Sequence, residues 1–153
     1  MEKSVNKTFK YAELNQQAIF GGTLARFSNL FISVRTDLAL RGIIQEWQKH
    51  SEAYTETYKK IIEQAKAEFP KAFDETPDPK QLKKMNEKYN PMVEELGNTE
   101  IKFEAKPVTI DADELQTALE NEKTEGFRLT TPHYIAIEDF IIINATDAVA
   151  EKD

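Results

Sequence analysis

Residues 40–65 read LRGIIQEWQKHSEAYTETYKKIIEQA, and the spacing of their apolar and small side chains decides the fold. These positions are separated alternately by four and three residues: Leu40, Ile44, Trp47, Ser51, Tyr54, Tyr58, Ile61 and Ala65. Such alternation is the heptad seam of a long amphipathic helix. We predict helix from about residue 30 to residue 69, because Pro70 disfavours helical conformation in the residue before it. Gly42 is a point where this helix could break or kink.

A second amphipathic helix follows the proline-rich turn at residues 70–79. Asp78 suits the N-cap of this helix and Pro79 suits its first position, whereas Gly97 suits its end. Pro91 could kink or restart the helix. The apolar stripe consists of Leu82, Met85, Tyr89, Met92 or Val93, and Leu96. Because only a short connection joins the two helices, we expect an antiparallel, coiled-coil-like hairpin over about residues 30–97.

The segments that flank the hairpin mix strand and helix patterns. Apolar and polar residues alternate in three short stretches, which predicts strands at residues 4–10, 101–103 and 108–110. A short helix is expected to begin at Tyr11 and to end at Gly21-Gly22, and another is expected to follow Asp111. Residues 133–142 favour an apolar C-terminal helix. Strand is the alternative for residues 135–143, which are rich in β-branched isoleucine.

Together these segments predict an α+β fold that is mainly α. A long antiparallel helical hairpin stands on a small base with two to four short strands and a C-terminal helix. The chain of 153 residues is long enough for one hydrophobic core, so we predict a single domain over residues 1–144 and a flexible polar tail at 145–153. The seam of the first helix is longer than the second helix. Its excess must pack on the base or on another copy, and we predict either a homo-oligomer formed through the long helix or the binding of a partner helix.

The acidic residues are concentrated at one end of the chain, whose net charge is −7. Residues 94–153 carry fifteen Asp and Glu against five Lys and Arg, whereas residues 1–60 carry six against nine. An acidic surface repels phosphate groups, so we expect no direct binding to nucleic acid. No apolar run is long enough to span a membrane, and the N-terminal residues lack the apolar core of a signal peptide. These features predict a cytoplasmic protein that does not bind membranes.

No arrangement of residues in the sequence indicates catalysis. Cysteine is absent, which excludes disulfides, thiolate metal sites and a cysteine nucleophile. Glu46 and His50 could share a cation one helical turn apart, but two ligands make an incomplete metal site. The nucleotide-binding, serine-hydrolase and metalloprotease motifs are also missing. The sequence therefore predicts a protein that is not an enzyme and has no cofactor and no metal.

The order of elements resembles small proteins of unknown function encoded by phages and prophages of Gram-positive bacteria. The resemblance is carried by five stretches: Phe9-Lys-Tyr-Ala-Glu-Leu14, the charged helix Gln45 to Phe69, Glu94-Glu95-Leu96, the alternating segment Ile101 to Ile110, and Asp113-Glu114-Leu115. It implies a phage origin and action in the cytoplasm of a host cell. It implies no catalytic residue.

These observations favour a non-enzymatic, phage-type protein–protein interaction module. We expect it to bind and inhibit or redirect a host factor of the defence or transcription machinery, partly through its acidic last third. The alternative is a virion assembly chaperone or scaffold protein. The candidate residues for binding a partner are Trp47, Tyr54, Tyr58, Glu114, Glu120, Glu122 and Glu125. Seam packing is the competing explanation for the three aromatic residues, and solubility alone is the competing explanation for the acids.

Overall fold

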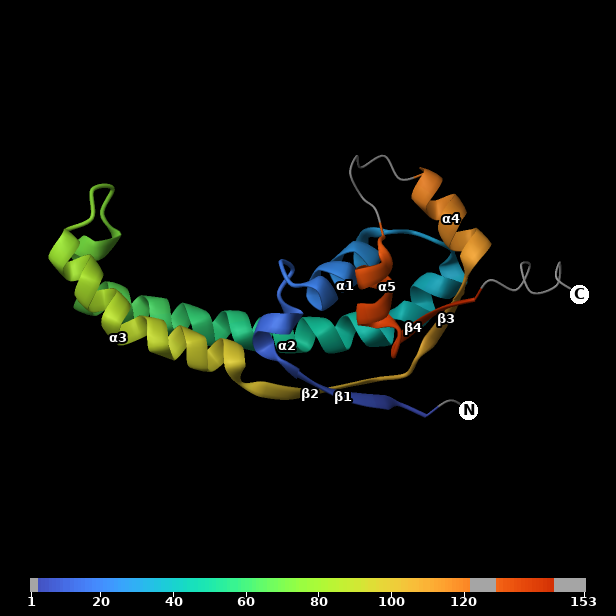
Figure 1. The fold of residues 1–153 in the computed structure, drawn as a ribbon, viewed down its shortest axis with the longest axis horizontal. Coiled ribbons are helices and arrows are strands. Elements are labelled where there is room, and N and C mark those ends of the chain that lie inside the picture. The colour runs from blue at the N-terminus through green and yellow to red at the C-terminus, as the bar shows by residue number, and fades with distance from the viewer. Residues whose placement is uncertain (1–2, 122–128, 145–153) are drawn as a thin grey trace, which may run out of the picture.

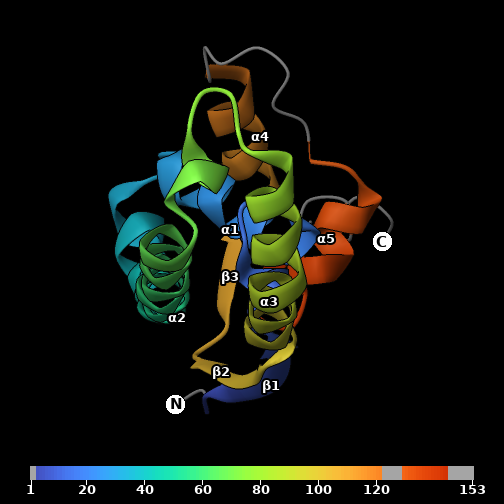
Figure 2. The ribbon, with the colours of Figure 1, turned by 90° about the vertical axis from the view of Figure 1, so that its left-hand side faces the viewer.

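The fold is dominated by a helical hairpin, seen in a computed structural model that describes residues 3–121 and 129–144 (Figure 1). Helix α2 (Val34–Glu68) and helix α3 (Pro79–Asn98) are joined by a short 3₁₀-helix (Pro70–Phe73) and a turn. They pack side by side (Figure 2). The hairpin predicted from the sequence is thus confirmed. Helix α2 continues through Gly42, and α3 continues through Pro91.

Side-chain caps fix where both hairpin helices begin. The backbone N–H of Thr36 donates to Ser33 Oγ at 3.1 Å, so α2 begins at Val34 and not near residue 30. The N–H of Gln81 donates to Asp78 Oδ2 at 3.1 Å, as expected for the predicted cap. Each bond satisfies a backbone donor that has no partner within its own helix. Residues 30–33 therefore form a connection that precedes the long helix.

The base contains short strands and helices drawn from both ends of the chain. Strand β1 (Val5–Lys10) pairs antiparallel with β2 (Glu100–Ala105), and β3 (Val108–Asp111) pairs parallel with β4 (Ile141–Asn144). Around them lie a 3₁₀-helix and three α-helices: Tyr11–Leu14, α1 (Ile19–Asn29), α4 (Ala112–Asn121) and α5 (Thr131–Ile137). Within the described residues this is the predicted mainly α, α+β architecture. The tail predicted at 145–153 lies outside them.

The core lies where the base meets the first half of α2. Phe9 stacks on Phe20 with ring centroids 4.2 Å apart, and Phe103 meets Phe140 edge-on at 4.9 Å. The α2 residues that contribute to this core are buried: Leu40, Ile43 and Trp47. The base therefore covers the part of the seam that α3 does not reach. Self-association through the long helix stays a prediction, but the excess seam no longer calls for it.

The position predicted for the first helix is wrong. Tyr11–Leu14 forms only a 3₁₀-helix, and Gly21 and Gly22 lie inside α1 instead of ending a helix. Both glycines instead allow the backbone of α1 to lie close to the backbone of residues 14–16. A Cβ atom on Gly21 would overlap the carbonyl oxygens of Leu14 and Asn15, and one on Gly22 would lie 2.6 Å from the carbonyl oxygen of Gln16. Only glycine allows α1 to lie this close to the preceding turn.

The C-terminal helix predicted over residues 133–142 is also wrong in its second half. Helix α5 ends at Ile137, and residues Ile141–Asn144 form strand β4 beside β3. The β-branched run from Ile141 to Ile143 favours strand. Pairing with β3 also buries Ile141 almost completely, which a free helix end would not do. Of the two alternatives considered for residues 135–143, helix is therefore realised at 135–137 and strand at 141–143.

A matched pair of glycine substitutions tests the packing of α1. Gly21→Ala should destabilise the protein by about 2–3 kcal/mol, because the new methyl group overlaps backbone carbonyls that cannot move freely. Gly42→Ala should instead stabilise it by up to about 1 kcal/mol, because nothing lies within 4 Å of the new Cβ and alanine favours helix. Urea unfolding measures both. Equal effects of the two substitutions would contradict this packing.

Candidate functional site

Trp47 belongs to the core and not to a binding surface. Only 5% of the residue is exposed, and its indole Nε1–H donates to the backbone carbonyl of Leu14 at 2.7 Å. A buried indole usually finds such a partner, which holds the ring in one orientation. Of the two interpretations of Trp47, seam packing is therefore the one that the structure favours.

Tyr54 and Tyr58 lie further along α2. The ring of Tyr54 lies 5.8 Å from that of Tyr11 and is stacked on that of Tyr58, with centroids 6.1 Å apart. Tyr54 is half-buried by these contacts, whereas Tyr58 is exposed. Tyr54 therefore links the hairpin to the base, and part of the Tyr58 side chain is open to solvent.

The acidic candidates lie on or after α4. Asp111 caps this helix by accepting the backbone N–H of Glu114 at 3.1 Å. Leu115 and Ala118 are buried toward the core, so the acidic side of α4 faces outward. Glu120 is exposed and accepts a hydrogen bond from Gln116 Nε2 at 3.1 Å. Glu122 and Glu125 lie outside the described residues.

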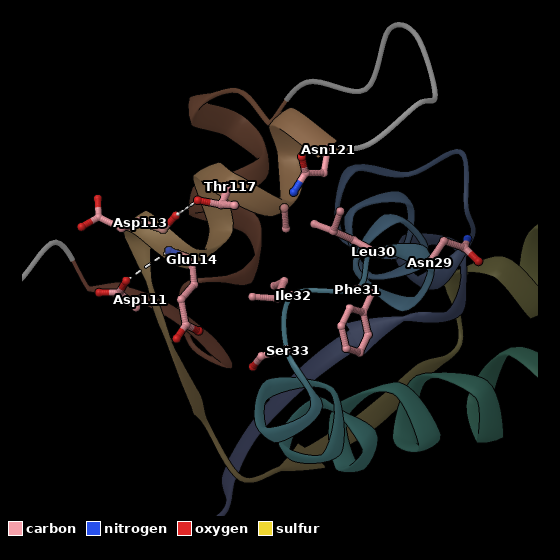
Figure 3. Close-up of a pocket in the computed structure, with 11 residues that line it drawn as sticks. Asn29, Leu30, Phe31, Ile32, Ser33, Asp111, Asp113, Glu114, Thr117 and Asn121 are labelled. Atoms are coloured by element: carbon pink, nitrogen blue, oxygen red, sulfur yellow. Dashed lines mark hydrogen bonds between the residues drawn. The ribbon is translucent and has the colours of Figure 1, made fainter.

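A groove of about 850 Å³ separates α4 from the connection between α1 and α2 (Figure 3). Glu114 lies on the α4 side of this groove and Phe31 on the opposite side, with Ile32 and Ser33 between them. Phe31 is 63% exposed. The lining residues come from these two segments: Asn29, Leu30, Phe31, Ile32, Ser33, Asp111, Asp113, Glu114, Thr117, Ala118 and Asn121.

The first two turns of α2 also carry exposed apolar side chains. Val34 and Leu38 are four residues apart, so they lie on the same side of the helix. Each is more than half exposed, like Phe31. The exposed apolar side chains of this region are therefore those of Phe31, Val34 and Leu38. The sequence prediction missed Phe31 because it placed residues 30–33 inside the helix. Recognition of Ser33 as the N-cap would have placed Phe31 in a connection.

Glu46 connects α2 to the edge of strand β2. Its Oε2 accepts the backbone N–H of Glu104 at 3.0 Å and lies 3.1 Å from His50 Nε2, while Oε1 lies 2.9 Å from Lys49 Nζ. Burial would raise the pKa of Glu46, but the hydrogen bonds from Glu104, Lys49 and His50 outweigh it, and the pKa is lowered. The Glu46–His50 pair considered above as metal ligands therefore has a structural role. The described residues contain no cluster of three or more potential metal ligands.

The groove at α4 combines an exposed aromatic ring with a carboxylate, which suits recognition of another protein. No helix among the described residues has the length and apolar character needed to cross a bilayer. Comparison of the chain with protein-family models, curated proteins and solved structures finds no match.

The lowered pKa of Glu46 predicts a pH-dependent contribution to stability. A carboxylate whose folded pKa lies below its ordinary value of 4.5 stabilises the fold above that pH, and the contribution is lost as pH falls through the folded pKa. Glu46→Gln should therefore cost about 1–2 kcal/mol at pH 7. The difference from the wild type should shrink as pH falls from about 5 toward 3.

Urea unfolding between pH 3 and pH 7 measures this difference. Glu52→Gln is the matched control, because Glu52 is an exposed carboxylate on the same helix. Its effect should stay near zero at every pH. A cost for Glu46→Gln that does not change with pH would show that its charge is not involved.

Proposed function

We propose that the protein is a non-enzymatic protein–protein interaction module whose partner binds in the groove at α4. The observation that carries this proposal is Phe31, which is 63% exposed and lines the same groove as Glu114 on the opposite wall. Single exposed apolar residues are ordinary, but here Val34 and Leu38, which follow Phe31 closely in the chain, are also more than half exposed. A contiguous exposed apolar patch beside polar groups is typical of a binding surface.

The chemistry of the groove indicates what the partner presents. Burial of a phenylalanine side chain contributes about 1.5–3 kcal/mol, so Phe31 can serve as the anchor of the interface. Glu114 lies across from it and favours a Lys or Arg on the partner. The expected partner surface therefore combines an apolar contact with a positive charge.

The resemblance to phage and prophage proteins leads us to propose a host factor as this partner. Defence and transcription proteins carry basic surfaces for nucleic acid, and an acidic groove with an aromatic anchor complements such a surface. Binding there would inhibit or redirect the host factor in the host cytoplasm. This is the inhibitor hypothesis reached from the sequence, now assigned to Phe31 and Glu114.

The projecting hairpin supports the second candidate function, a virion assembly chaperone or scaffold protein. Helices α2 and α3 extend well beyond the base (Figure 1), and Phe73 near their joining turn is partly exposed. A partner that uses the hairpin end would contact Phe73 and not Phe31. The two functions therefore predict different contact residues and different partners, a host protein or a virion subunit.

Substitutions at the two surfaces separate these functions. Phe31→Ala should weaken partner binding at least tenfold, because it removes the apolar anchor from the groove, and Glu114→Lys should weaken it through charge reversal. Phe73→Ala, the matched aromatic control, should leave binding unchanged. Affinity capture from infected cells with mass spectrometry identifies the partner, and calorimetry on the purified pair measures each change. Loss of binding only with Phe73→Ala would refute the groove and favour assembly.

A further inference from the structure

One edge of strand β1 carries backbone groups that do not pair with β2. In the antiparallel ladder Val5 faces Ala105 and Lys10 faces Glu100. The N–H of Tyr11 continues it by donating to the carbonyl of Thr99 at 3.1 Å. Hydrogen-bonded and non-hydrogen-bonded pairs alternate in such a ladder. The odd-numbered residues of β1 therefore bond to β2, whereas the backbone groups of residues 6, 8 and 10 point toward the opposite edge.

The side chains of Glu46 and Glu13 each accept a backbone N–H at one outer edge of this small sheet, and the middle of the β1 edge stays open. Glu104 faces Asn6, and its N–H points away from β1 to Glu46, as the alternation requires. On the other edge, the N–H of Lys10 donates to Glu13 Oε1 at 2.9 Å. The backbone N–H and C=O groups of Asn6 and Thr8 point away from the ladder. Within the described part of the chain they have no other hydrogen-bond partner. Both residues are exposed.

An apolar groove of about 520 Å³ runs beside this open edge. Its walls come from β1 and from helices α1 and α5. Ile19 is 54% exposed and Ile135 is 56% exposed, while Phe20 and Pro132 add apolar surface. Successive side chains of a strand point to opposite faces. A strand added to the β1 edge would therefore place every second side chain toward this groove.

The charges of β1 indicate which side chains an added strand would carry on its other face, away from the groove. Residues 3–10 carry Lys3, Lys7 and Lys10 and no acid. Lys7 is paired with Asp139 at 2.9 Å, whereas Lys10 is exposed on the same side of the strand as Thr8. A second copy of β1 would set lysines against lysines, which disfavours edge-to-edge self-pairing. Carboxylates on the added strand would complement these charges.

We propose that the edge of β1 binds an extended segment of another protein in which apolar and acidic residues alternate. The segment adds a third strand beside Asn6 and Thr8, buries its apolar side chains against Ile19 and Ile135, and directs its carboxylates toward Lys10. Backbone pairing provides affinity and the groove provides specificity in this kind of recognition. The site lies on the side of the molecule opposite α4 (Figures 1 and 2) and does not depend on the function proposed above.

The test is an NMR titration of the ¹⁵N- and methyl-labelled full chain with the peptide acetyl-Glu-Val-Glu-Val-Glu-amide. Chemical shifts should change mainly at the amides of Asn6 and Thr8 and at the methyl groups of Ile19 and Ile135. A peptide with lysine in place of glutamate should bind at least tenfold more weakly. Shifts elsewhere, no shifts, or equal binding of both peptides would overturn the proposal.

Two variants check the geometry of this site. Thr8→Pro removes an edge N–H that the β1–β2 ladder does not use, so the fold should persist while peptide binding falls at least tenfold. Ile135→Glu changes only an exposed groove residue and should weaken binding through loss of apolar contact and like-charge repulsion. If both variants bind the acidic peptide as the wild type does, the added-strand geometry is wrong.

Discussion

The backbone carbonyl of Leu14 lies against both α2 and α1, and the arrangement of the base depends on this contact. This carbonyl accepts the indole N–H of Trp47 from α2, and Gly21 brings α1 against the same carbonyl. The contact therefore joins the 3₁₀-helix Tyr11–Leu14, α1 and the long helix at one point. Strand β1 leads directly into that 3₁₀-helix, and the connection that carries Phe31 follows α1. Both proposed binding surfaces are thus positioned by the packing around Leu14.

The long helix packs against two different parts of the structure along its length. Its first half, with Leu40, Ile43 and Trp47, completes the aromatic core of the base. Its second half pairs with α3, where Tyr89 Oη donates to Glu68 at 2.7 Å and its ring meets Phe69 edge-on. This second half is more exposed than the first, and Ala65 is its one buried residue.

Local sequence patterns predicted the hairpin and the strands at residues 4–10, 101–103 and 108–110. The role of Gly21 depends instead on a contact between segments that the sequence alone does not bring together. The helix over residues 40–65 and the Asp78 cap were predicted from local patterns, and both are confirmed. Gly21 looked like a helix end because a sequence does not show which carbonyl a glycine will meet. For the candidate site, Glu114 could be selected from its charge. Phe31 was missed because residues 30–33 were placed inside the long helix, whereas the Ser33 cap leaves them in the connection before it.

The most direct test of this account is hydrogen exchange at the indole N–H of Trp47, the one tryptophan in the chain. If this proton is bonded to Leu14 inside the core, it exchanges only when the base opens. Its exchange should then be at least about a thousandfold slower than that of free tryptophan, as expected for a group that opens at a cost of several kcal/mol. A rate close to that of free tryptophan would show that α2 is not fixed to the base in this way and would contradict the fold's central contact.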